Sequence, residues 1–257
     1  MVTETVEGLI ALSEKKIEML KSSGSRYLVL SMMAGIYVGF GIVLIFSIGA
    51  PLNTIGSVGL KALMGVSFGV ALTLVIFAGS ELFTGNNMIM TIGSLAKKVS
   101  WLNTIKLWSF CFIGNLIGSL LLVFIVFKTG MFTKGPSFDF ISNIAFAKGT
   151  ATFQSLFLKG ILCNMLVCLA VWTSARTKND GAKILLIFWC LFTFIGSGFE
   201  HSIANMSVIG IGVAVSDLVT WGHFWHNMIP VTLGNMVGGG FFIGAAYWFV
   251  ANKNIKS

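Results

Sequence analysis

Long apolar runs alternate with short polar segments along the whole chain. A membrane-spanning helix needs about 20 mainly apolar residues, and six stretches reach this length. They cover residues 28–50, 62–83 with a continuation to 92, 106–127, 151–175, 183–207 and 227–250. Glycine and polar residues interrupt the second and fifth stretches. The pattern predicts an all-α membrane protein with six transmembrane helices, of which helices two and five are broken.

Two further segments complete the expected organisation. In residues 1–26, apolar side chains recur at helical spacing opposite charged ones, which predicts an amphipathic helix. It lies on the cytoplasmic membrane surface or is a solvated tail, and the pattern fits both. The polar segment 130–149 predicts an outside loop, with a short helix near 138–147.

Composition and charge support a membrane protein and exclude nucleic acid as a partner. Only 10% of residues are charged, against about 25% in soluble domains. The net charge of +8 resides at the ends of the apolar runs and forms no basic stripe of the kind that binds nucleic acid. Counted with the N-terminus inside, twelve lysines and arginines fall on the inner side and five elsewhere. The positive-inside rule therefore predicts a multi-pass protein with both termini in the cytoplasm.

The chain repeats itself at a spacing close to 120 residues. Gly-Ser-Glu-Leu-Phe-Thr at 79–84 recurs as Gly-Ser-Gly-Phe-Glu-His at 196–201, and Gly-Asn at 114–115 recurs at 234–235. An odd number of spans in each half requires the second half to be inverted in the membrane. We therefore expect one channel domain at 27–252, built from repeats at about 27–127 and 150–250, followed by a tail at 253–257.

The two interruptions fall at matching places and predict a binding site. Broken helices in inverted repeats expose half-helix N-termini at the membrane centre, and the positive dipole ends found there favour an anion. Ionisable groups at this depth are costly and usually functional. His201 is either a site for proton exchange or a hydrogen-bonded structural histidine, and the two alternatives weigh evenly. Glu200 is expected to fix Lys148 or backbone amides, and Lys159 is a rival to Lys148 as the group that attracts anions.

Other chemistry finds weak support in the sequence. The four cysteines lie inside apolar runs without the spacing of a zinc site or a disulfide framework. His223 and His226 stand beside tryptophans without an acidic or cysteine partner, so an aromatic interface belt is favoured over a metal site. No common hydrolase, zinc-protease or haem signature is present. We expect no cofactor, no metal and no enzymatic activity.

Four motifs resemble the formate/nitrite transporter family, and the similarity extends over nearly the whole chain. They are Gly-Ser-Glu-Leu-Phe-Thr-Gly at 79–85, Gly-Ile-Leu-Cys-Asn-Met-Leu-Val-Cys-Leu-Ala at 160–170, Phe-Glu-His-Ser-Ile-Ala-Asn-Met at 199–206 and Asn-Met-Ile-Pro-Val-Thr-Leu-Gly-Asn at 227–235. The first two are long and specific. Within the family, the chain looks closest to the hydrosulfide-channel branch.

The resemblance implies an aquaporin-like fold in a bacterial plasma membrane, assembled as a homopentamer with one pore per subunit. It implies that His201 and Thr84 form the pore centre, that Lys148 lends positive potential to the outer vestibule, and that Asn164 and Asn205 support that region. Hydrophobic constrictions are implied on both sides of the centre. Leu82, Phe83 and Phe194 belong to one, and Phe68 and Leu72 to the other. In some relatives the N-terminal helix closes or gates the pore.

We therefore expect a channel for small monovalent anions, with hydrosulfide first and formate or nitrite next. The alternative is a proton-coupled formate or nitrite carrier, which would show concentrative uptake that collapses with the proton gradient. A neutral-solute facilitator is disfavoured because the paired Asn-Pro-Ala signature is absent.

Overall fold

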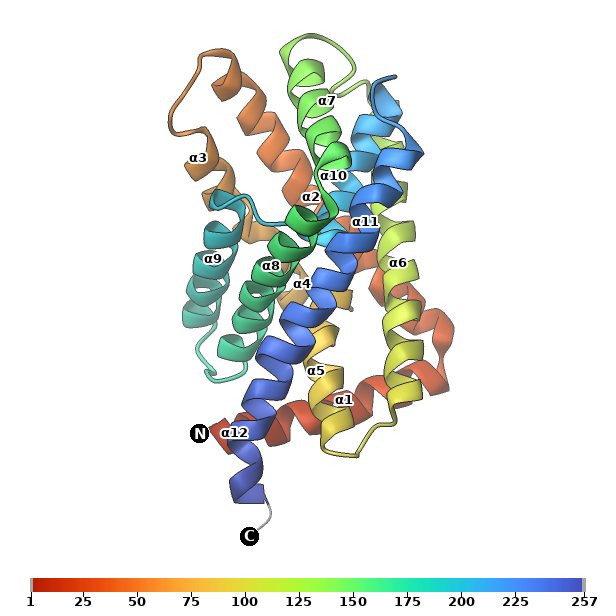
Figure 1. Ribbon diagram of the computed structural model, residues 1–257, viewed down its shortest axis with the longest axis vertical. Coiled ribbons are helices and arrows are strands. Elements are labelled where there is room, and N and C mark those ends of the chain that lie inside the picture. The colour runs from red at the N-terminus through yellow and green to blue at the C-terminus, as the bar shows by residue number, and fades with distance from the viewer. Residues whose placement is uncertain (1, 256–257) are drawn as a thin grey trace.

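The computed structural model describes residues 2–255, with side chains described to residue 252, and these residues form helices and short connections (Figure 1). The elements in chain order are α1 (Val2–Ser22), α2 (Gly24–Thr54), α3 (Leu60–Ser67), α4 (Gly69–Phe77), α5 (Phe83–Leu95), α6 (Trp101–Lys128), α7 (Gly135–Thr150), α8 (Phe153–Ser174), α9 (Asp180–Gly196), α10 (Ser202–Val215), α11 (Trp221–Met236), a π-helical segment (Val237–Ala245) and α12 (Ala246–Ile255). No strand occurs among them.

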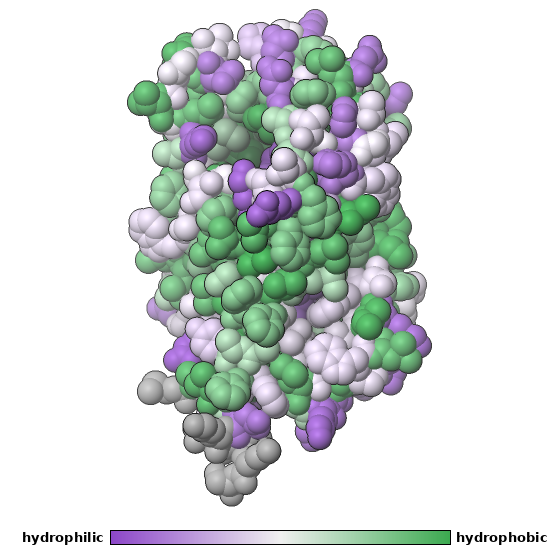
Figure 2. Space-filling model, in the orientation of Figure 1, coloured by the Kyte–Doolittle hydropathy of each residue, from purple (hydrophilic) through white to green (hydrophobic). Residues whose placement is uncertain are grey.

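The membrane class predicted from the apolar runs agrees with these helices. Five segments are long and apolar enough to cross a bilayer, namely Gly24–Thr54, Leu60–Phe77, Trp101–Lys128, Phe153–Ser174 and Trp221–Asn252. The fifth predicted span is divided between α9 and α10, neither of which reaches 18 residues by itself. On the face shown in Figure 2, hydrophobic residues predominate across the middle of the molecule and hydrophilic residues are more frequent toward its two ends.

Pairs of long helices pack closely through glycine. A Cβ added at Gly118 of α6 would lie 1.9 Å from the carbonyl oxygen of Met32 in α2, and one at Gly234 of α11 would lie 2.2 Å from that of Phe157 in α8. Small residues at such positions let helix backbones approach in a membrane. The α2–α6 and α8–α11 pairs therefore form a framework against which the broken helices rest.

Both ends of the described chain lie at the same end of the molecule, where α1 crosses beneath α5 (Figure 1). The predicted N-terminal helix is present, and its buried face includes Val6, Leu9, Lys16 and Ile17. At the opposite end, α7 occupies the predicted outside loop. It spans 16 residues and is longer than the expected helix at 138–147, because it begins at Gly135 with a proline in its first turn.

The division into an N-terminal helix, one channel domain and a tail stays a prediction. Residues 256 and 257 of the predicted tail lie outside the described residues.

Candidate functional site

Two symmetrical breaks define the centre of the molecule. After α4 and after α9 the backbone turns at Gly79 and Gly198, which have φ angles of 74° and 70°. Only glycine adopts this left-handed conformation without steric cost. The chain then becomes extended and starts a new helix at Phe83 in the first half and at Ser202 in the second.

One asparagine closes each break by binding backbone groups that would otherwise lack partners. The Oδ1 of Asn115 accepts from the Phe83 amide at 2.9 Å, and its Nδ2 donates to the carbonyl oxygens of Glu81 and Ser31. Asn235 repeats this arrangement with the Ser202 amide and the carbonyl oxygens of Glu200 and Gly160. Non-helical backbone at membrane depth requires such partners.

These contacts correct the register of the internal repeat. Glu81 matches Glu200 and Leu82 matches His201, each pair 119 positions apart, because the glycines with positive φ are Gly79 and Gly198. The repeat predicted from the sequence pairs Gly79 with Gly196, which is the last residue of α9. Thr84 is therefore not the symmetry mate of His201, and the two halves contribute different chemistry to the centre.

Thr84 and His201 nevertheless meet. The Thr84 Oγ1 lies 2.9 Å from the His201 Nε2, and both side chains are buried. The Asn164 Nδ2 donates to the Thr84 carbonyl oxygen at 3.2 Å and to the Asn235 carbonyl oxygen at 2.6 Å. Asn164 of α8 thereby links the start of α5 to α11.

The hydrogen bonds of His201 assign its tautomer. His201 is the N-cap of α10, and its Nδ1 accepts from the Ala204 amide at 3.1 Å. A backbone N–H can only donate, so Nδ1 carries no hydrogen and the hydrogen of the neutral ring is on Nε2. Nε2 then donates to Thr84 Oγ1, which leaves the Thr84 hydroxyl hydrogen available to a third group. A second proton on the ring would break the cap and place a cation at the positive end of a helix dipole.

Four of the five predicted constriction residues line one small cavity beside His201. Leu82, Phe194, Phe68 and Leu72 enclose about 10 Å³ together with Val38 and Leu191, among others. The rings of Phe68 and Phe194 meet edge to face at 5.7 Å. These two residues, predicted on opposite sides of the centre, are thus in direct contact.

Phe83 does not join this cavity. Its ring packs edge to face on Phe112 of α6 at 5.2 Å. It lines a separate apolar groove between α6 and α11. The chain direction explains this placement, because Phe83 is the first residue of α5 and the next residue, Thr84, carries the side chain that reaches His201.

Beside the second break, on the side away from the termini, Lys148 forms an ion pair with Glu200. The Lys148 Nζ lies 2.9 and 2.8 Å from the two carboxylate oxygens. The Asn205 Nδ2 donates to Glu200 and to the Asn227 Oδ1, and the Asn227 Nδ2 donates to the Lys148 carbonyl oxygen. Glu200 therefore offsets much of the charge of Lys148. The side chain of Lys159 is exposed on α8, and its carbonyl oxygen accepts from the Glu200 amide.

A second ion pair lies beside the first break, on the side of the termini, and it was not predicted from the sequence. The Lys16 Nζ of α1 is 2.6 Å from both oxygens of Glu81, which also accepts from the Tyr27 hydroxyl and the Asn86 Nδ2. Glu81 and Glu200 are symmetry mates, so each break carries one lysine–glutamate pair. One feature of the sequence could have predicted this pair. Lys16 is a charged residue on the face of α1 that also holds Ser13 and Ile17, so it needs a buried acidic partner.

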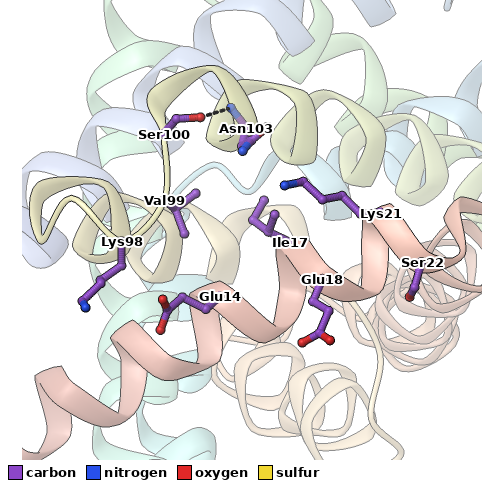
Figure 3. Close-up of a pocket in the computed structure, with 9 residues that line it drawn as sticks. All are labelled: Glu14, Ile17, Glu18, Lys21, Ser22, Lys98, Val99, Ser100 and Asn103. Atoms are coloured by element: carbon purple, nitrogen blue, oxygen red, sulfur yellow. Dashed lines mark hydrogen bonds between the residues drawn. The ribbon is translucent and has the colours of Figure 1, made fainter.

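Three cavities adjoin α1. One of about 460 Å³ is lined by Lys16 and Leu12 of α1 and reaches Leu72 and Leu82, which also line the central constriction. A second, of about 530 Å³, lies between α1 and the segment 175–178 that follows α8. The third, of about 540 Å³, lies between α1 and the α5–α6 connection (Figure 3). Its charged side chains Glu14, Glu18, Lys21 and Lys98 have mixed signs, and none of its lining residues belongs to the centre.

Comparisons with known proteins agree with this architecture. The family model described as formate/nitrite transporter matches residues 3–249. The nitrite transporter NirC of Salmonella typhimurium is 40% identical over 260 residues, covering 99% of this chain and 94% of the relative.

Two solved structures have the same fold. One, described as an FNT family ion channel, superposes with a TM-score of 0.91 at 40% identity and covers 96% of this chain and 99% of that one. Another, described as a pentameric formate channel with formate bound, has a TM-score of 0.79 at 31% identity and covers 90% and 98%. These confirm the predicted aquaporin-like fold of inverted repeats and a class of channels and transporters rather than enzymes. The chain belongs to the formate/nitrite transporter family.

Proposed function

We propose that the protein is a membrane channel for small monovalent anions of weak acids, with hydrosulfide as the first substrate and formate and nitrite as further ones. The observation that carries the proposal is the Thr84–His201 pair, placed where two half-helices begin and beside an apolar cavity of about 10 Å³. Two hydrogen-bonding side chains with the dipole ends of α5 and α10 offer an anion a stable stop between hydrophobic rings.

The cavity of about 10 Å³ is at the lower limit for one water molecule. All three anions are larger than water, so each of them requires wider separation of Phe68 and Phe194. Hydrogen sulfide is the weakest acid of the three parents, so its anion is the easiest to protonate. The named relatives are a nitrite transporter and a formate channel, so all three anions belong in the test.

In the proposed mechanism, His201 acts as a neutral hydrogen-bond donor. Through Nε2 it orients Thr84, and the Thr84 hydroxyl then donates to the anion. An isolated charge in an apolar constriction is very costly, so the anion crosses as, or close to, its neutral acid. Since the Nδ1 of His201 is engaged by the Ala204 amide, the anion takes up its proton from the aqueous solution in one vestibule and releases it to the solution in the other. Of the two alternatives that the sequence left open for His201, this proposal adopts the hydrogen-bonded histidine and not the site of proton exchange.

Each vestibule contains one lysine–glutamate pair. Lys148 remains the group proposed to attract anions on the outer side, with Glu200, Asn205 and Asn164 as its supports. Lys16 of α1 forms the matching pair with Glu81 on the inner side, where α1 would close the inner mouth. We place both termini in the cytoplasm and the protein in a bacterial inner membrane, where it forms a homopentamer, the assembly named for the formate channel of the same fold.

The test is a flux panel in liposomes with hydrosulfide, formate, nitrite and chloride at two pH values. A channel gives downhill flux of the three weak-acid anions with hydrosulfide fastest, and little chloride flux. The panel is run with the same pH on both sides, because a pH gradient would accumulate a weak acid through either kind of pathway. Flux that saturates with anion concentration, as binding and alternating access require, would instead support a proton-coupled formate or nitrite carrier. Chloride flux equal to that of hydrosulfide would refute the weak-acid proposal.

A further inference from the structure

An apolar groove on the outside of the helix bundle is separate from the ion pathway. It has a volume of about 290 Å³ and lies between α6 and α11, with Phe83 as its only lining residue from α5. Its other lining residues are Ile105, Trp108, Ser109, Phe112, Ile113, Thr232 and Met236. Five of these belong to α6 and reach from Ile105 to Ile113, about 12 Å along the helix axis.

The groove lies at hydrocarbon depth and opens toward one membrane surface. Residues three or four apart share a face of a helix, so Trp101 stands one turn below Ile105. Lys106 directly follows Ile105, the lining residue nearest the start of α6, and lies beside the lower end of the groove. A lysine side chain there can extend along the apolar surface and place its ammonium at the mouth. Trp101 and Lys106 are both exposed. A tryptophan and a lysine at a helix end are typical of the layer that contains the lipid headgroups.

The charge at this opening is positive. Lys97, Lys98 and Lys106 lie on or beside the start of α6, and α6 itself carries no acidic residue. The nearest acidic side chains that line a cavity with this segment are Glu14 and Glu18, which belong to α1 and the separate pocket of Figure 3. The combination of an apolar slot and a cationic mouth matches a phospholipid, whose acyl chain and phosphate have the same order along the membrane normal.

We propose that the α6–α11 groove binds one acyl chain of an anionic phospholipid whose phosphate is held at Lys106. The bound chain contacts Phe83 and Phe112, and Trp108 in the same wall donates from Nε1 to the Asn86 carbonyl oxygen at 3.0 Å. The lipid therefore braces the half-helix that carries Thr84, from the side opposite the pore.

The test is native mass spectrometry of the solubilised oligomer with added phosphatidylglycerol or phosphatidylcholine. We expect phosphatidylglycerol to be retained about fivefold better, the effect of one lysine beside an anionic headgroup. Lys106→Gln should abolish this preference, whereas Lys128→Gln, at the other end of the same helix, should keep it. Equal retention of the two lipids by the unmodified protein would overturn the proposal.

A second variant tests the groove itself. Ser109→Phe places a ring where the acyl chain lies and should lower the retention of both lipids. Ile117→Phe, on the exposed side of α6 above the groove, should leave retention unchanged. If Ser109→Phe keeps its lipid, the groove holds no acyl chain. If it instead lowers the mass of the oligomer, a second copy of the protein is the occupant of the groove. Lys106 is exposed, so its variant reports even if Ser109→Phe fails to fold.

Discussion

Thr84 and His201 lie 117 positions apart and come from non-equivalent places in the two repeats, yet their side chains form a 2.9 Å hydrogen bond at the centre of the molecule. In the symmetry of the breaks, His201 corresponds to Leu82, and Leu82 lines the apolar cavity beside it. The centre is therefore asymmetric. One half supplies the imidazole of His201, the N-cap of α10. The other supplies the hydroxyl of Thr84, the second residue of α5.

Thr84→Val keeps the shape of the side chain and removes the hydroxyl. A hydrogen bond to a charged group contributes about 1.5–3 kcal/mol, so hydrosulfide and formate flux in liposomes should fall roughly tenfold or more. Thr91→Val, a buried position further along the same helix, is the control and should retain most of the flux. Equal losses in the two variants would mean that the effect comes from α5 packing and not from the central hydroxyl.

The tautomer of His201 is directly measurable. Nitrogen-15 NMR of protein with labelled histidine should show one ring protonated only at Nε2 between about pH 8 and pH 6, because its Nδ1 caps α10. The three histidines are distinguished with His223→Gln and His226→Gln. A resonance of His201 that becomes doubly protonated in this range would restore proton exchange at the ring and refute the neutral-donor mechanism.

The sequence predicted the broken helices because their polar residues have no place in a continuous span. The register predicted for the internal repeat was wrong by two residues. The similar residues after Gly79 and Gly196 suggested that pairing, whereas the backbone turns at Gly79 and Gly198. The separation of Phe83 from the constriction was not predictable either. Neighbouring residues at a helix start point in different directions, and which of them faces the pore depends on the packing of α6.

The Lys16–Glu81 pair should hold α1 against the channel. Lys16→Gln leaves Glu81 buried with two polar partners, Tyr27 and Asn86, and without its cation. Loss of one partner of a buried ion pair is strongly destabilising, so hydrogen exchange over residues 2–22 should speed up roughly tenfold or more. Lys15→Gln changes an exposed neighbour and should leave exchange unaltered. If both variants exchange at the unmodified rate, α1 is held by its apolar face alone.

Asn115 and Asn235 should be essential to stability out of proportion to their size. Asn235→Ala strands the Ser202 amide and the carbonyl oxygens of Glu200 and Gly160, and each buried unsatisfied group costs about 1–3 kcal/mol. The thermal midpoint of the purified protein should therefore fall for Asn115→Ala and Asn235→Ala. Asn103→Ala, whose side chain lines the pocket of Figure 3, should change it little. A midpoint equal to that of Asn103→Ala would show that water replaces the asparagine at the break.

Lys148→Glu tests the proposed attraction of anions at the outer mouth. The substitution places a second carboxylate beside Glu200, which the Lys148 ammonium contacts at 2.8 Å, and reverses the local potential. Anion flux should fall roughly tenfold, and by more at low ionic strength, where charges are less screened. Lys159→Glu changes an exposed side chain on α8 and should have a small effect. The double variant Lys148→Glu with Glu200→Lys keeps an ion pair and the net charge, so it shows whether flux depends on the position of the lysine or only on the contact. Equal reductions for Lys148→Glu and Lys159→Glu would assign the attraction to both lysines, and no reduction in either would assign it to the half-helix dipoles.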